Sequence, residues 1–206
     1  LDMLGTQTFG NFRDVLRLTT VSTAMGQYLD MKGAAKADSV SGSIPSENYA
    51  REMLQLFSIG TVELNLDGSV RLDGAGKPIP TYDEATVQEF ARALSGWNFG
   101  GQDQTKTWRW LYPDTWDPDP IIAANKSCNA WSRPMEPWVA AYRSADNTRD
   151  ITGPAHDMGA KTLLNGMAVP AGRTAGQDLE SVIDSVFLHP NVGPFIGRRH
   201  IQRLVT

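Results

Sequence analysis

Residues 44–60 read IPSENYAREMLQLFSIG, the clearest helical pattern in the chain. Ser43 or Ser46 can accept the first free backbone N–H groups, and a proline is tolerated in the first turn of a helix. Gly60 stands where a left-handed residue commonly ends one. The apolar side chains that recur at helical spacing are Tyr49, Met53, Leu56 and Phe57. The stretch therefore predicts one amphipathic helix packed against a core.

Further helical patterns lie on both sides of this segment, over residues 1–31, 81–97, 178–188 and 191–205. Asn11 is the predicted N-cap of a helix within residues 1–31, and Asp178 that of the helix over residues 178–188. The helix over residues 81–97 begins with Asp83 as its cap, or with Thr81 and Glu84 as a capping box. The expected fold class is mainly α, a single helical domain over residues 1–206.

Two segments interrupt the helical patterns. Residues 61–80 alternate apolar and polar side chains around Asp67 and Gly68, which predicts an inserted β-hairpin with the only regular antiparallel pairing of the domain. Residues 98–150 are rich in proline and aromatic residues and have no sustained period, so we expect a long irregular segment held by aromatic packing. Some of its rings should stay exposed as a binding surface, and the candidates are Trp108, Trp110, Trp116, Trp131 and Trp138.

The charge and the apolar content exclude several classes. The 206 residues carry 19 basic and 23 acidic side chains, a net charge of −4. Nucleic-acid binding needs concentrated positive charge, so no nucleic-acid partner is expected. No apolar run approaches the roughly 18–20 residues that span a bilayer, so no transmembrane segment is expected. Cys128 is the single cysteine, which excludes an intrachain disulfide. The start at Leu1, without a leader pattern, indicates a piece of a longer product.

Charged residues lie beside the apolar stripe of residues 44–60. Glu47 and Arg51 are four positions apart on one helical face, as are Asn48 and Glu52. Unpaired charges near a core are costly, so we expect a salt-bridge network between helices in which Arg51 or Arg92 is mostly buried. The proposed bonding partners are Glu47, Glu52 and Glu84. The alternative is a catalytic site of Glu47, Glu52 and Arg92, in which one carboxylate acts as a general base.

A second polar group lies in residues 156–164, a short strand or extended segment. His156 and Asp157 are adjacent, and Lys161 follows. Metal phosphohydrolases use such pairs together with several further ligands. Only His189 and His200 remain as histidines, so we expect no metal and assign His156, Asp157 and Lys161 to the structural polar network with Asn48, Arg51 and Glu84.

Other ligand signals are weak. The acidic residues around 114–119 could offer oxygen atoms to calcium, although their spacing fits no established loop and solvated loop acids are the favoured interpretation. These residues are Asp114, Asp117 and Asp119, with Asn125 nearby. The stretch from Gly74 to Lys77 lacks the following Ser/Thr helix of a phosphate loop, and Cys128 has no adjacent histidine, so no cofactor is expected.

Four ordered segments together resemble one bacterial family, domain of unknown function 1800. They are Ser46–Gly60, Tyr82–Trp97 with its ARALSGW ending, His156–Leu164, and Leu179–Pro190 continuing to Arg198; Tyr28-Leu29-Asp30 adds to the pattern upstream. The matches extend from about residue 25 to residue 205 in the family's order. The ordered set carries the resemblance rather than any one motif.

The resemblance implies a mostly helical protein that is exported to the periplasm, cell surface or medium. It implies that N- and C-terminal parts of the family's longer chains lie outside this sequence. Members are often encoded beside an exported, alkaline-phosphatase-like family, domain of unknown function 1501, which is therefore an expected partner. The resemblance supplies no reaction.

These observations favour an exported, non-catalytic binding or assembly domain, with a polysaccharide as a second expected ligand through exposed aromatic rings. The alternative function is a periplasmic or secreted hydrolase that uses the Glu47, Glu52 and Arg92 patch. A catalytic patch should line an open cleft, whereas a structural network should be closed and mutually hydrogen-bonded.

Overall fold

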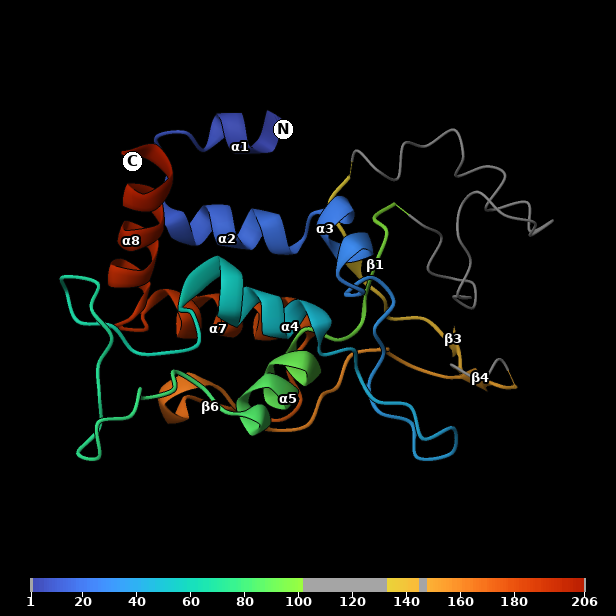
Figure 1. The fold of residues 1–206 in the computed structure, drawn as a ribbon. Coiled ribbons are helices and arrows are strands. Elements are labelled where there is room, and N and C mark those ends of the chain that lie inside the picture. The colour runs from blue at the N-terminus through green and yellow to red at the C-terminus, as the bar shows by residue number, and fades with distance from the viewer. Residues whose placement is uncertain (1, 102–132, 145–147, 206) are drawn as a thin grey trace.

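The computed structural model describes residues 2–101, 133–144 and 148–205. The fold is mainly α, with short antiparallel strand pairs between the helices (Figure 1). The helices are α1 (Asp2–Thr6), α2 (Phe12–Thr20), α3 (Thr23–Tyr28), α4 (Asn48–Glu52), the π-helix η1 (Met53–Ser58), α5 (Glu84–Ala93), the 3₁₀ turn η3 (Leu164–Gly166), α7 (Ala175–Phe187) and α8 (Val192–Leu204).

Helix α7 forms the centre of the core. Its apolar face is Leu179, Val182, Ile183 and Val186, all buried. Helices α2 and α5 both pack against α7, and α4 packs against α5, so the main core lies among these four helices. A smaller apolar cluster of Trp138, Tyr142 and Ala155 lies apart from it. Within the described residues, none of the helices has the length and apolar content required to cross a bilayer.

Two of the predicted helix starts are confirmed. Asn11 accepts a hydrogen bond from the Arg13 backbone N–H at 2.8 Å, and Asp83 accepts one from Thr86 at 2.8 Å. The predicted cap at Asp178 is wrong. Thr174 caps α7 in a capping box with Gln177, and Asp178 lies inside the first turn, fully buried.

The helix predicted at residues 44–60 begins later and changes type. It starts at Asn48 and becomes a π-helix at Met53, in which the backbone bonds from residue i to i+5. Residues five apart then share one face, so Ser58 and Ile59 join Met53 and Leu54 in the core. Leu56, which the apolar stripe had included, is instead 47% exposed.

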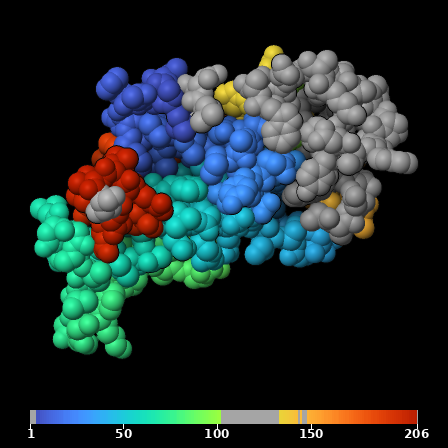
Figure 2. All heavy atoms as spheres, turned by 45° about the horizontal axis from the view of Figure 1, so that its top comes forward, coloured from blue at the N-terminus to red at the C-terminus, as the bar shows by residue number. Residues whose placement is uncertain are grey.

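The segment predicted as a hairpin, residues 61–80, is called the arm below. Its pairing consists of isolated antiparallel bridges, Val62 with Pro80, Leu64 with Val70 and Leu72 with Pro78. The arm projects from the helical body beside α8 (Figures 1 and 2). The expectation that regular antiparallel pairing occurs only here is wrong, because the structure places such pairs elsewhere.

The regular strand pairs belong to the second half of the chain. β1 (Trp97–Asn98) pairs with β2 (Glu136–Pro137), β3 (Tyr142–Arg143) with β4 (Asp150–Ile151), and β5 (Lys161–Thr162) with β6 (Ala168–Val169). Each strand has two residues, too few to show a period in the sequence. Most of the predicted irregular segment 98–150 lies outside the described residues.

Candidate functional site

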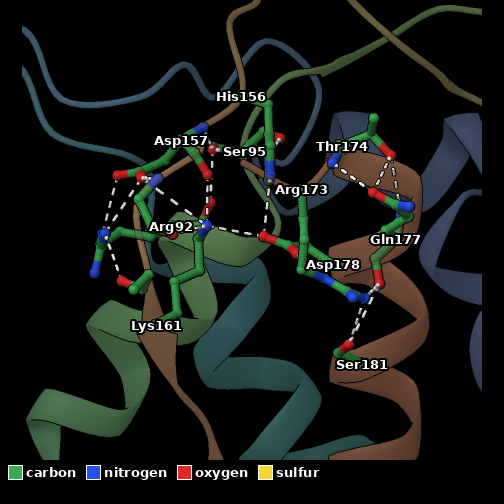
Figure 3. A network of polar contacts seen from close by, with 12 residues as sticks. Arg92, Ser95, His156, Asp157, Lys161, Arg173, Thr174, Gln177, Asp178 and Ser181 are labelled. Atoms are coloured by element: carbon green, nitrogen blue, oxygen red, sulfur yellow. Dashed lines mark hydrogen bonds and ion pairs between the residues drawn. The ribbon is translucent and has the colours of Figure 1, made fainter. Parts of the chain in front are cut away.

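A buried cluster of charged side chains joins α5, the segment around β5 and α7 (Figure 3). Asp178, in the first turn of α7, lies within it and is fully buried. One carboxylate oxygen, Oδ2, accepts from Lys161 Nζ at 2.8 Å and lies 3.1 Å from His156 Nε2. The other, Oδ1, accepts from Arg173 Nε at 2.9 Å. Asp178 therefore binds three basic side chains at once.

Lys161 is enclosed on every side. Its side chain has no exposed surface, and besides Asp178 it donates to the backbone carbonyls of Asp157 at 2.5 Å and Gly159 at 2.9 Å. An ammonium group has three donors, so this one is fully satisfied. Because successive strand residues point to opposite faces, Lys161 of β5 points inward while Thr162 is exposed.

Arg92 connects the cluster to α5. Its Nε and Nη2 donate to the two carboxylate oxygens of Asp157 at 2.9 and 3.2 Å, a two-pronged contact that sets the orientation of both groups. Its Nη1 donates to Glu89 at 2.6 Å, and Nη2 also reaches the Ala160 carbonyl at 3.1 Å. The second Glu89 oxygen accepts from the Thr162 N–H at 3.0 Å.

Ser95 and Gly96 bring residues 155–157 against the end of α5. The Ser95 carbonyl lies 2.9 Å from His156 Nδ1, and the Ser95 hydroxyl accepts from the Asp157 N–H at 2.9 Å. Gly96 has a φ of +86°, and a Cβ there would lie 2.5 Å from the His156 backbone nitrogen. Only glycine fits this position without a shift of the backbone.

The electrostatics favour ionised carboxylates. Burial alone raises the pKa of Asp157 and of Asp178, but hydrogen bonds to their charged forms outweigh it. The donors are Arg92 and the Gly159 N–H for Asp157, and His156, Lys161 and Arg173 for Asp178. Both pKa values therefore lie below the ordinary value of 3.8.

A family model described as "Protein of unknown function (DUF1800)" matches residues 1–206. The chain belongs to this family. No curated protein and no solved structure matches the chain.

Two of the segments that carry the DUF1800 resemblance meet in the cluster. Arg92, Ser95 and Gly96 belong to the second segment, and His156, Asp157 and Lys161 to the third. The fourth begins at residue 179, directly after Asp178. Charged residues of this DUF1800 chain that are far apart in sequence thus form one continuous network.

The other predicted charged patch forms a separate group. Arg51 donates to Glu47 at 2.9 Å and to Glu84 at 2.8 and 3.1 Å, and Asn48 donates to Asp30 at 3.2 Å. The predicted bond between Arg51 and Glu84 of the neighbouring helix is confirmed. Of the two arginines for which burial was predicted, Arg92 is the less exposed, with 29% of its side chain exposed against 38% for Arg51.

The three candidate catalytic residues have different surroundings. Glu47 is bonded to Arg51, and Arg92 to Glu89 and Asp157. The side chain of Glu52 forms no hydrogen bond or ion pair with the described part of the chain. Arg92 lies eight residues along α5 from Glu84, about 12 Å at 1.5 Å per residue. Arg92 therefore belongs to the Asp178 cluster rather than to a patch with Glu47 and Glu52.

The predicted aromatic surface can be compared at one position. Trp138 is 4% exposed, and its indole N–H donates to the Ala141 carbonyl at 3.1 Å, so this ring packs inside. The other candidate tryptophans, the acidic residues considered for calcium and Cys128 lie outside the described residues. They are Trp108, Trp110, Trp116 and Trp131, with Asp114, Asp117, Asp119 and Asn125.

The charged groups of the cluster are satisfied within the fold. Each of its charged groups binds at least one partner within the fold. The hydrogen bonds of the two buried charges, Asp178 and Lys161, all go to protein atoms. Across residues 2–101, 133–144 and 148–205, no three His, Cys, Asp or Glu side chains gather as a metal site would require. The contacts of the cluster hold α5, β5 and α7 together.

Sequence reasoning missed Asp178, Arg173 and Glu89 as members of the cluster. Asp178 directly precedes an apolar run, which is the position of a cap, so local rules assigned it there. A signal was present four residues earlier, where Thr174 and Gln177 form a better capping box. With Thr174 as the cap, Asp178 becomes a helix residue on the same face as Val182.

Proposed function

We propose that this chain is an exported, non-catalytic binding or assembly domain whose docking element is the arm. The observation that supports it is a projecting arm with exposed apolar side chains and a rigid base. Leu66 is 96% exposed, Leu72 is 56% exposed, and Val70 is also exposed. Large apolar side chains gathered on one exposed element are typical of protein-interaction sites.

The base of the arm is fixed by one buried amide. Asn191, just before α8, accepts from the Leu64 N–H at 2.6 Å and donates to the carbonyls of Ile59 at 2.6 Å and Val62 at 2.9 Å. Arg198 of α8 adds a bond to the Gly68 carbonyl at 3.2 Å. A pre-ordered element loses little entropy when it binds, which favours a docking role.

The partner that we propose is a protein rather than a polysaccharide. Sugar rings are bound by exposed aromatic faces, and Trp138 offers none. The arm presents aliphatic side chains instead, which suit the apolar centre of a protein interface. The exported, alkaline-phosphatase-like family of domain of unknown function 1501 is the first partner to test, and a soluble polysaccharide is the comparison.

The hydrolase alternative has less support. It requires Glu47, Glu52 and Arg92 to act together in an open cleft, and Arg92 is instead committed to Glu89 and Asp157. A general base also needs a free position beside it for the reacting group. The contacts of Glu47 and Arg92 fit the structural network better.

The experiment is a binding titration with three forms of the protein. Immobilised wild type, Leu66→Ser/Leu72→Ser and a matched control, Leu188→Ser, would be titrated with the alkaline-phosphatase-like protein and with the polysaccharide. Leu188 is also exposed but lies at the C-terminal end of α7 rather than on the arm. We expect the arm variant to bind the protein at least about tenfold more weakly, because two apolar contacts are lost, and the control to bind as wild type.

Equal binding by the arm variant and the wild type would overturn the docking role. Binding of the polysaccharide alone would overturn the choice of partner. Export is tested separately by fractionating cells of the native host, where detection only in the cytoplasm would contradict it.

A further inference from the structure

A pocket lies between α8 and the base of the arm. Its volume is about 280 Å³, just below the usual range of about 300–1,000 Å³ for small-molecule sites. Val62, Leu64 and Phe195 line an apolar side, and Arg198, Arg199 and Gln202 line a polar one. The pocket lies at the base of the arm, apart from the exposed leucines of the proposed docking surface.

The two arginines of the pocket, unlike most others in the described residues, form no ion pair with a carboxylate. Seven arginines form an ion pair with a carboxylate: Arg13, Arg17, Arg51, Arg71, Arg92, Arg149 and Arg173. Arg198 and Arg199 have no carboxylate partner among the described residues, and α8 contains no Asp or Glu. The pocket therefore carries two uncompensated positive charges in a chain whose net charge is −4.

The fold holds both guanidinium groups at the pocket. Arg198 uses Nη1 for the Gly68 carbonyl, which anchors the side chain and leaves its other donors for a ligand. Arg199 Cζ lies 5.3 Å from the centre of the Phe195 ring, a cation–π contact that uses none of the N–H donors of the guanidinium. Phe195 itself is buried, so its ring is a fixed support.

The helix dipole does not account for these charges. Basic side chains are favoured in the last turn of a helix, which explains Arg203. Arg198 and Arg199 lie at the seventh and eighth of the 13 residues of α8, beyond the reach of that effect.

We propose that this pocket binds a small organic molecule with a phosphoryl group. Two guanidinium forks that line one pocket match the charge of a phosphate monoester dianion better than that of a single carboxylate. The apolar side formed by Val62, Leu64 and Phe195 would contact the organic part of the ligand. The site is independent of the proposed docking role, because it uses neither Leu66 nor Leu72.

The test is an amide and arginine-side-chain NMR titration of the whole chain. Phenyl phosphate is the probe, and inorganic phosphate and benzoate are the comparisons, since each retains only one part of the proposed ligand. We expect shifts at the backbone of Gly60 and Thr61, which line the pocket, and at Arg199 Nε. Phenyl phosphate should bind at least about tenfold more tightly than benzoate, because it offers a second charge to the arginine pair.

Two variants and one control complete the design. Arg198→Gln and Arg199→Gln should each weaken phenyl phosphate binding about tenfold or more. Arg203→Gln removes the same charge from α8 at a position that does not line the pocket, and it should change the affinity less than about twofold. The unliganded amide spectrum of each variant checks that it is folded.

Three results would overturn the proposal. The first is equal weakening by all three variants, which would mean attraction to the general charge of α8. The second is benzoate binding as tight as that of phenyl phosphate. The third is the absence of a chemical-shift change at Gly60, Thr61 or Arg199 up to about 10 mM phenyl phosphate, which would mean that the pocket does not bind the probe.

Discussion

Lys161 Nζ lies 2.8 Å from Asp178 Oδ2, and neither side chain has any exposed surface. One residue comes from β5 and the other from α7, so this ion pair joins a short strand to the central helix. A buried pair of this kind is weak support for net stability, because desolvation opposes the attraction. Removal of one partner is costly all the same, since the other is left charged and buried.

Lys161→Met should lower the free energy of unfolding by about 3–5 kcal/mol, because the buried negative charge of Asp178 then loses the ammonium group that compensates it. Urea unfolding followed by circular dichroism measures this. Lys77→Met, at an exposed position on the arm, is the control and should leave the unfolding midpoint unchanged. A loss below about 1 kcal/mol in Lys161→Met would contradict the assigned role of the ion pair.

Arg92→Ala should cost more than Arg51→Ala. Arg92 is 29% exposed and holds Asp157 with two donors, so we expect a loss of about 2–3 kcal/mol, below that of a fully buried pair. Arg51 forms more exposed ion pairs, for which a loss of at most about 1 kcal/mol is expected. The same unfolding measurement ranks the two variants, and the reverse order would place the structural network on α4.

Gly96→Ala should destabilise the fold by at least about 1–3 kcal/mol, because its φ of +86° disfavours any side chain and the His156 backbone occupies the space of a Cβ. Gly197→Ala is the matched control. It lies within α8 with nothing within 4 Å of its Cβ position, so alanine should be neutral or slightly stabilising there. Thermal melts distinguish the two, and equal effects would mean that the close approach at residue 96 is unimportant.

Acid should destabilise the protein through Asp157 and Asp178. Their pKa values in the folded state lie below 3.8, so the unfolded chain binds more protons when the pH falls. The stabilisation is fully present above about pH 3.8 and is lost as the pH falls through the lower pKa of the folded form.

This pH dependence is measured by urea unfolding between about pH 6 and pH 2. The slope below pH 3.8 should be smaller in Asp178→Asn, which cannot titrate there. Carboxyl carbon NMR of the wild type gives a second reading without a variant. An Asp178 resonance that titrates at or above 3.8 would refute the prediction.

Asn191→Ala should release the base of the arm. Without the amide, the Leu64 N–H and the Ile59 and Val62 carbonyls lose a common partner, which costs at least about 2 kcal/mol. Hydrogen exchange at Leu64 should become faster, while exchange at Val182 in the core of α7 changes only with global stability. Unchanged protection of Leu64 would mean that the arm is ordered by other contacts.

Local rules predicted what depends on neighbours in the sequence. The caps at Asn11 and Asp83 need only a side-chain oxygen and an N–H two or three residues away, so the pattern was sufficient. The apolar faces of α5 and α7 follow from their spacing for the same reason. The turn at Asp67 and Gly68 was also predicted, although its ladder is less regular than expected.

The cluster depends on partners that no local pattern joins. Arg92 meets Asp157 across 65 positions, and Asp178 is reached from His156 and Lys161 across 22 and 17. From spacing alone, Arg92 of α5 was predicted to lie beside the charged residues of α4, since α4 and α5 both carry charges next to their apolar faces. Packing of α5 on α7 selected the other arrangement, and this long-range term is absent from a sequence window.

The π-helix at Met53–Ser58 holds one residue more than an α-helix of the same number of turns. A turn that bonds to i+5 contains one residue more than an α-turn, so deletion of one residue here would leave an ordinary α-helix. The wider turn takes up the additional residue, so the residues after the deletion would keep about the same direction around the helix axis. Ile59 would then stay in the core, and the chain would still enter the arm from the same side. A DUF1800 relative one residue shorter here could therefore keep its arm in the same place.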